Sequence, residues 1–183
     1  MKVHVIYSSL SGCTKRLAQR IYENLDTSDK AIFDLAQGAP DTDADVLLLG
    51  YWVDKGGPNT AMKELMDAIS GKYVGIFCTL AYFCDSRHGM NSILAGAEAL
   101  KERNTIIGTY VCNGALSPKL IEQFRTRTAG PHSASPASEI RWEIFKNHPT
   151  EKECALGGER FAERLRMLKQ MREAGIEFES IIK

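Results

Sequence analysis

The chain of 183 residues is 44% hydrophobic, which is enough apolar material for one domain with its own core. Its 23 basic and 23 acidic side chains balance, so charge gives no reason to expect nucleic acid or an anionic membrane as a partner. No apolar run approaches the roughly 18 residues of a membrane span, and no secretory signal precedes the first apolar run. We therefore expect a single domain over residues 1–183, with no nucleic-acid and no membrane partner.

Five cysteines are spread along the chain without forming a CxxC pair. An odd number of scattered cysteines is typical of reduced thiols, and we therefore expect a cytoplasmic protein. His132 and His148 stand in different segments, and no cysteine or histidine lies at ligand spacing from either of them. We therefore predict no metal site.

Short apolar runs and amphipathic stretches alternate through the first 112 residues. The apolar runs predict five strands, at Lys2–Tyr7, Ala31–Leu35, Asp45–Trp52, Tyr73–Thr79 and Thr105–Cys112. The amphipathic stretches predict helices at Cys13–Leu25, at Thr60–Ile69 with Asn59 or Thr60 as cap, and at Ser92–Arg103 or from a few residues earlier. This alternation predicts an α/β fold of three layers, in which helices cover both faces of a doubly wound parallel sheet.

The pattern changes after Cys112. We expect a helix at Leu116–Phe124, a loop rich in Gly, Pro and Ser at Thr128–Ser138, a short helix at Glu139–Lys146 and a long closing helix at Pro149–Arg172. Thr150 and Glu153 form a capping-box pattern at the start of the closing helix, although the Gly157-Gly158 pair weakens its first turns. Residues 113–148 have too few apolar side chains for their own core, so we interpret them as an excursion from the single domain.

The stretch VIYSSLSGCTKRLAQRI (Val5–Ile21) holds the most specific motif of the chain. An apolar run stops at a group of hydroxyls around Gly12, and a helical pattern begins at once. Free N–H groups and the helix dipole favour an anion there, to which Ser9, Ser11 and Thr14 add hydroxyl donors. Neither GxGxxG nor GxxxxGK[ST] is present, which disfavours a dinucleotide or a Walker site. The motif therefore predicts a site for the monoester phosphate of a cofactor.

The run from Val5 to Thr14, with Ala18 and Ile21 after it, resembles the FMN-phosphate signature of the flavodoxin family along its whole length. Cys13 departs from it, because many flavodoxins have Asn at this place. The resemblance implies a flavodoxin-like fold with strand order 2-1-3-4-5 and FMN as the cofactor. The residues implied at its phosphate are Ser9, Leu10, Ser11, Gly12, Cys13 and Thr14.

The same resemblance implies that the flavin ring lies between the loops that follow the third and fourth strands. At the third strand, Trp52 either stacks on the ring or is a core or rim residue, and Val53 and Asp54 follow it. The peptide at Gly56-Gly57 either reorients when the flavin is reduced or forms a plain turn before a helix.

The loop after the fourth strand is implied to serve the pyrimidine edge of the flavin. Its contact residues would be Thr79, Leu80, Ala81, Tyr82 and Phe83, with Tyr82 or Phe83 against the ring. Cys78 and Cys84 flank this loop, and their spacing matches no dithiol motif, which favours small buried hydrophobic roles.

The segments CNGALSPKLIEQF and NHPTEKE more loosely resemble a flavodoxin-domain group of anaerobes, some of whose members are paired with bilirubin reductase. We therefore expect an FMN-binding redox protein that carries electrons or serves as the flavin partner of a reductase, and that needs no catalytic side chain. An FMN-dependent NAD(P)H or quinone reductase is the first alternative, and a flavin-free adaptor is the second. The excursion could cover the flavin, dock a partner or pair two subunits as a homodimer.

Overall fold

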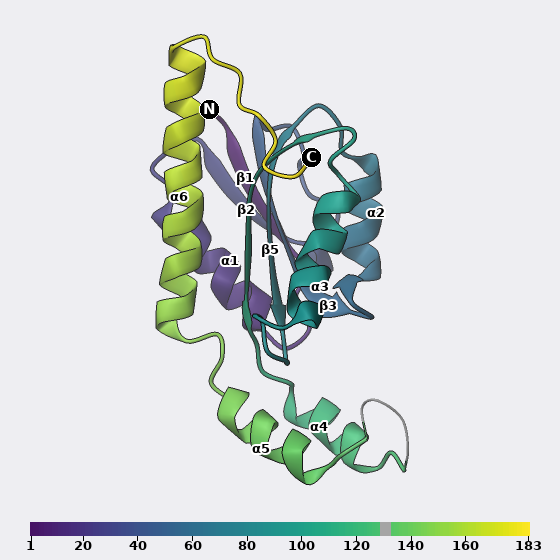
Figure 1. Cartoon of the computed structure of the whole chain (residues 1–183). Helices are drawn as coiled ribbons and strands as arrows, with labels where there is room; N and C mark the ends of the chain where they lie inside the picture. Colours follow the sequence, from purple (N-terminus) through teal and green to yellow (C-terminus); the bar gives the residue numbers. More distant parts are fainter. Residues whose placement is uncertain (129–132) are drawn as a thin grey trace.

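The computed structural model describes residues 1–128 and 133–183, and its centre is one parallel sheet (Figure 1). The strand order β2-β1-β3-β5-β6 uses β1 (Val3–Tyr7), β2 (Lys30–Asp34), β3 (Val46–Asp54), β5 (Tyr73–Leu80) and β6 (Thr105–Asn113). A two-residue strand, β4 (Gly57–Pro58), pairs only with the end of β3. The five long strands therefore confirm the predicted order 2-1-3-4-5.

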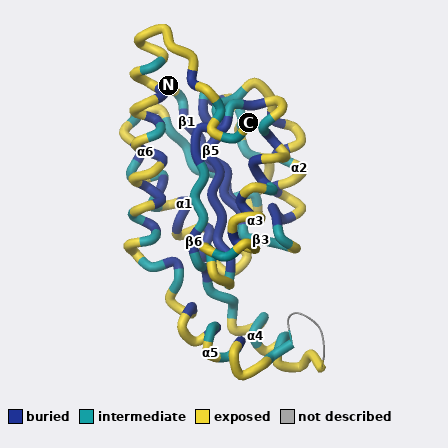
Figure 2. Tube along the Cα trace, viewed as in Figure 1, coloured by how far each residue is buried: buried dark blue, intermediate teal, exposed yellow. Residues whose placement is uncertain are grey.

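Helices cover both faces of the sheet, as the alternation of elements predicts. On one face lie α1 (Cys13–Asn24) and α6 (Glu151–Glu173), and on the other lie α2 (Thr60–Ala68) and α3 (Arg87–Glu98) (Figure 1). Side chains alternate along each strand, so that Leu48 joins the core under α1 and α6 while Leu47 and Leu49 join the core under α2 and α3. Figure 2 shows the strands as the buried centre of the molecule.

The closing helix α6 begins with the predicted capping box, in which Thr150 and Glu153 bond reciprocally to each other's backbone N–H. The Gly157-Gly158 pair does not interrupt this helix. A Cβ atom on Gly157 would lie 2.7 Å from Leu17 Cδ1 of α1, so the absence of a side chain lets the two helices pack closely. The glycines therefore serve helix packing at this crossing.

Two predicted boundaries are wrong. Helix α3 begins at Arg87, in line with the predicted option of a start a few residues before Ser92, because Ser86 accepts a hydrogen bond from the N–H of Gly89 and caps it there. The predicted end at Arg103 is wrong, since the helix ends at Glu98. The predicted loop at 128–138 also ends sooner, because Ser135 caps α5 (Pro136–Phe145). Residues 129–132, and with them His132, lie outside the described residues.

The remaining elements connect the layers. A 3₁₀ turn, η1 (Leu35–Gln37), follows β2 and is capped by the Asp34 carboxylate, and α4 (Pro118–Arg125) follows β6. Helices α4 and α5 extend beyond the carboxyl ends of the strands (Figure 1). Arg125 of α4 bonds to Glu139 of α5, and the rings of Phe124 and Trp142 lie 6.0 Å apart, so the two helices form one layer.

Within the described residues, no helix has the length and apolar character needed to cross a membrane.

Candidate functional site

The three predicted loops meet at the carboxyl edge of the sheet, where parallel α/β proteins bind ligands. They follow β1, β3 and β5, which are neighbours in the sheet. The N–H of Ser8 donates to the carbonyl of Gly50 over 2.8 Å, and Asn59 Nδ2 donates to Ser8 Oγ over 3.0 Å. The hydroxyls of Thr14 and Thr79 lie 3.0 Å apart. Direct hydrogen bonds therefore hold the three loops together.

The loop after β1 is open where α1 begins. Gly12, the N-cap residue, has φ 86° and ψ −10°, a left-handed conformation that suits glycine, and it has no side chain with which to cap the helix. Leu10 is 57% exposed, and Ser11 and Gly12 are exposed as well. Ser9 Oγ accepts a hydrogen bond from the N–H of Lys15 over 3.2 Å. The loop thus presents two hydroxyls and the start of a helix to solvent.

The three predicted phosphate-binding hydroxyls occupy two different environments. Ser9 is half-buried and Ser11 is exposed, whereas Thr14 is fully buried and shares its hydrogen bond with Thr79. In this structure the Thr14 hydroxyl therefore links α1 to β5, and Ser9 and Ser11 are the side-chain donors within reach of a ligand.

Cys13 joins the first loop to both ends of the excursion. Its Sγ atom accepts the N–H of Ala115 over 3.2 Å and the hydroxyl of Ser11 over 3.2 Å, and donates to the carbonyl of His148 over 3.3 Å. The side chain is buried. This role could not be read from the sequence, because its partners are 102 and 135 residues away.

The β3–β4 hairpin carries the second loop. Asp54 pairs with Gly57, and the turn residues Lys55 and Gly56 have φ values of 50° and 82°. Positive φ at both central residues is the geometry of a two-residue hairpin whose twist matches that of its strands. Gly57 lies buried in β4, so the Gly-Gly-Pro segment forms the return arm of a hairpin.

Trp52, Val53 and Asp54 are all half-buried at the end of β3. Tyr51 points to the opposite face, as the alternation predicts, and its fully buried hydroxyl donates to the carbonyl of Ser92 over 2.7 Å. Burial raises the pKa of Tyr51, which keeps this phenol neutral. Trp52 pairs with Thr79 of β5 in the sheet register, at the carboxyl edge of the sheet.

The loop after β5 passes from the core to the surface. Thr79 and Leu80 are buried, Ala81 is half-buried, and Tyr82 and Phe83 are 39% and 48% exposed. The two rings pack edge to face, with centroids 5.1 Å apart. Exposed aromatic side chains beside the sheet edge can pack against a planar ligand.

All five cysteines are free. Burial raises the pKa of the Cys78 and Cys112 thiols, so both remain neutral. This agrees with the predicted role of Cys78 as a small buried hydrophobic residue. Among the described residues, no group of three or more His, Cys, Asp or Glu could hold a metal ion.

Comparison with known proteins identifies the family. The family model of the flavodoxin domain matches residues 4–160. The flavodoxin-like domain-containing protein BilS of Clostridioides difficile (strain CD3) is 30% identical over 163 residues, which cover 84% of this chain and 90% of that protein. The chain belongs to the flavodoxin family.

Solved flavodoxins share its fold. A flavodoxin from the domain Archaea has a TM-score of 0.60, with 16% identity over 92% of this chain and 99% of that one. The flavodoxin of Fusobacterium nucleatum, determined with bound flavin mononucleotide, has a TM-score of 0.54, with 16% identity over 92% and 97% of the two chains. These likenesses confirm the flavodoxin-like fold.

In this flavodoxin, α5 packs on the loop after β5. The rings of Phe83 and Phe145 lie 5.6 Å apart, and the guanidinium of Arg141 lies 4.9 Å from the centre of the Tyr82 ring. The imidazole of His88 lies 6.0 Å from the same tyrosine. Sequence reasoning missed Arg141 and Phe145, since α5 comes from the excursion and carries no motif that places it here.

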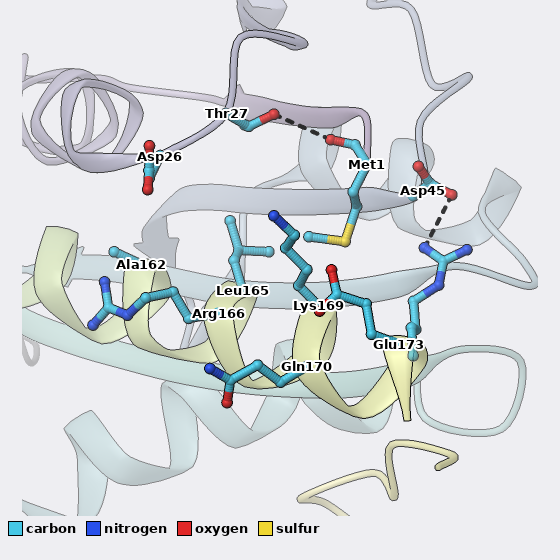
Figure 3. A pocket seen from close by; sticks show the side chains of 11 residues that line it. Met1, Asp26, Thr27, Asp45, Ala162, Leu165, Arg166, Lys169, Gln170 and Glu173 are labelled. Atoms are coloured by element: carbon cyan, nitrogen blue, oxygen red, sulfur yellow. Dashed lines mark hydrogen bonds and ion pairs between the residues drawn. The ribbon is translucent and has the colours of Figure 1, made fainter. Parts of the chain in front are cut away.

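A hollow of about 600 Å³ lies at the opposite end of this flavodoxin, beside the amino ends of the strands (Figure 3). It is lined by Met1, Thr27, Asp45 and the last turns of α6, where Arg172 bonds to Asp45 over 3.3 Å. None of the predicted site residues lines it. The candidate site is therefore the carboxyl edge.

Proposed function

We propose that this flavodoxin binds FMN at the carboxyl edge of its sheet and transfers electrons between protein partners. The observation that carries the proposal is the meeting of three loops around the start of α1, where the N-cap residue Gly12 is left-handed and Ser9 and Ser11 offer hydroxyls. The family supports FMN as the cofactor. When bound, FMN supplies the redox chemistry, and the chain supplies binding and surroundings.

The residues at the first loop fit a phosphate. Residues 8–14 contain no acidic side chain, and the helix start adds N–H groups and the positive end of a dipole. In the same region, Asn59 Oδ1 is buried without a hydrogen-bond partner in the described structure, beside the bond from Asn59 to Ser8. A buried acceptor left open here is available to a hydroxyl of the cofactor.

The residues at the other two loops fit a planar ring. We propose that Trp52 on one side and Tyr82 or Phe83 on the other pack against it, with Val53, Asp54 and Thr79 to Ala81 around its edge. The left-handed Gly56 and its neighbour Gly57 give the hairpin turn a peptide that can change orientation, since glycine has no Cβ to oppose it. This freedom supports a turn that responds to the redox state of the flavin.

For the partner, we propose a flavoprotein reductase or an electron acceptor protein. The likeness to BilS, which covers 84% of this chain, supports a place beside that flavodoxin-like protein. In this role the partner delivers or accepts the electrons, and no side chain of the site is needed as a catalytic acid or base. Five free thiols support a reducing compartment such as the cytoplasm.

The test is the visible absorption spectrum of the purified protein, first with added FMN and then during stepwise reduction. We expect one FMN per chain, no reduction by NAD(P)H alone, and rapid reduction once a flavoprotein reductase is added. A protein that remains colourless after FMN is added would be a flavin-free adaptor. Rapid turnover of NAD(P)H by the protein alone would identify a self-sufficient reductase instead. Either result would overturn the proposal.

A further inference from the structure

Arg141 reaches the candidate site from the excursion. It lies on α5, and its guanidinium carbon is 4.9 Å from the centre of the Tyr82 ring, in the loop after β5. The packing of Phe145 on Phe83 holds the same helix to the same loop, with ring centroids 5.6 Å apart. Two contacts therefore fix the position of this cation at the edge where we place the flavin.

The charge of Arg141 is not neutralised within the described structure. It makes no ion pair and no hydrogen bond with any described residue, and its Nε atom is buried without a partner. The carboxylates on its own helix are turned elsewhere, because Glu139 pairs with Arg125 and Glu143 pairs with Lys146. Partial burial of a cation without a counter-charge is unfavourable, so a negative group that binds beside it would be stabilised.

The other ionisable groups of the loop after β5 do not act as a counter-charge for Arg141. Asp85 and Arg87 are both exposed, and their charges are of opposite sign. His88 approaches the Tyr82 ring to 6.0 Å. None of these three forms an ion pair with Arg141, so within the described residues the guanidinium is the half-buried cation that faces the aromatic loop.

We propose that Arg141 stabilises the negative charge that FMN gains on reduction and thereby raises the reduction potential of the bound flavin. This inference rests on the proposed function. Two electrons from the reductase and one proton from solvent convert neutral oxidised flavin into a reduced flavin with one negative charge on its ring. The guanidinium supplies only its positive charge and transfers no proton in this step. Arg141 thus acts through its positive charge, which the excursion brings to the site.

The experiment compares the dissociation constants of oxidised and reduced FMN for the full chain and for Arg141→Gln. We expect Arg141→Gln to weaken the binding of reduced FMN roughly tenfold more than the binding of oxidised FMN, because the variant lacks the positive charge that attracts the reduced ring. Such a ratio corresponds to a fall of about 30 mV in the two-electron potential, measured by equilibration with a reference dye. Arg141→Lys should restore most of the potential, because it returns the positive charge.

Arg127→Gln is the matched control, because Arg127 also stacks on an aromatic ring, that of Phe124, at 4.8 Å, and belongs to the same excursion. Arg127→Gln should leave the ratio of the dissociation constants of oxidised and reduced FMN unchanged. If Arg141→Gln does not fold, as judged by circular dichroism, Arg141→Met replaces it and keeps an aliphatic stem over Tyr82. An unchanged ratio in a folded Arg141 variant overturns this inference alone. Failure of the unaltered chain to bind FMN overturns the proposed function as well.

Discussion

The hydroxyl groups of Thr14 and Thr79 lie 3.0 Å apart in the interior, where they join the first turn of α1 to the end of β5. The strands that carry the two loops are not neighbours, because β3 lies between them. This hydrogen bond therefore connects the loops that follow β1 and β5, although β3 lies between these two strands. Both side chains are almost completely buried, so each hydroxyl depends on the other for a partner.

Thr14→Val should lower the free energy of unfolding by about 1–3 kcal/mol, because it leaves the buried Thr79 hydroxyl without a partner. The double variant with Thr79→Val should lose less than the sum of the two single variants, since it removes both polar groups together. Urea unfolding followed by circular dichroism measures all three. Strictly additive losses would show that the two hydroxyls do not depend on each other.

Ser11→Ala should weaken FMN binding roughly tenfold and leave riboflavin binding nearly unchanged. Only FMN has a phosphate to which the Ser11 hydroxyl could donate a charge-assisted hydrogen bond. Titration calorimetry with both ligands measures the difference. Ser28→Ala, at an exposed position outside the three loops, is the control. Equal losses for both ligands would place the phosphate away from the first loop. Thr14→Val, by contrast, should affect both ligands alike, since its hydroxyl faces inward.

Gly157→Ala should destabilise the protein even though alanine favours a helix by about 1 kcal/mol over glycine. The new Cβ would lie 2.7 Å from Leu17 Cδ1 and 3.0 Å from the Tyr110 ring, which forces α6 away from α1. We expect a net loss of about 1–3 kcal/mol, measured by thermal and urea unfolding. Leu156→Ala, at an exposed position on the same helix, should change stability little. A gain for Gly157→Ala would contradict the close packing of the two helices.

Iodoacetamide at pH 8 should modify Cys84 first in the folded protein, and all five cysteines in denaturant. Cys84 is the half-buried cysteine, whereas the other four are buried. Burial raises the pKa of Cys78 and Cys112, and that of Cys154 to about 11, so these thiols carry almost no reactive thiolate at pH 8. Burial and Asp85 raise the pKa of Cys84 as well, so its greater accessibility is what places it first. Mass spectrometry of peptides gives the order. Early modification of Cys78 or Cys112 in the native state would disprove their burial.

Asp45→Asn should reduce stability at pH 7 and make little difference below the lowered pKa of the folded carboxyl. The backbone N–H of Lys2 donates to Asp45 over 2.8 Å and, with Arg172, holds the pKa of this carboxyl below its usual range. A lowered pKa stabilises the fold above the unfolded pKa of about 3.9 and loses that effect as pH falls through the folded value. Because the side chain is partly exposed, we expect less than about 1 kcal/mol, measured as the difference in unfolding free energy at pH 7 and pH 2.5. A difference that persists at the lower pH would exclude the charge as its cause.

Much of the fold could be read from local pattern. Apolar runs and amphipathic spacing predicted the five long strands and the helices that cover them, because backbone periodicity depends on neighbours within a few residues. The capping box at Thr150 and Glu153 could be predicted for the same reason. The start of α3 was predicted only to within a few residues, because Ser86 caps a first turn whose apolar pattern is weak.

The first loop was also identified from sequence, since hydroxyls around a glycine between a strand and a helix are a local signal. By itself, the sequence thus determined the order of the elements, the family motif and the edge of the sheet at which a ligand would bind. Only the tertiary structure decided that Thr14 turns inward to Thr79, that Cys13 holds both ends of the excursion, and that Arg141 lies over Tyr82. Each of these contacts joins segments dozens of residues apart, and packing brings such segments together through burial and hydrogen bonding that no local pattern records.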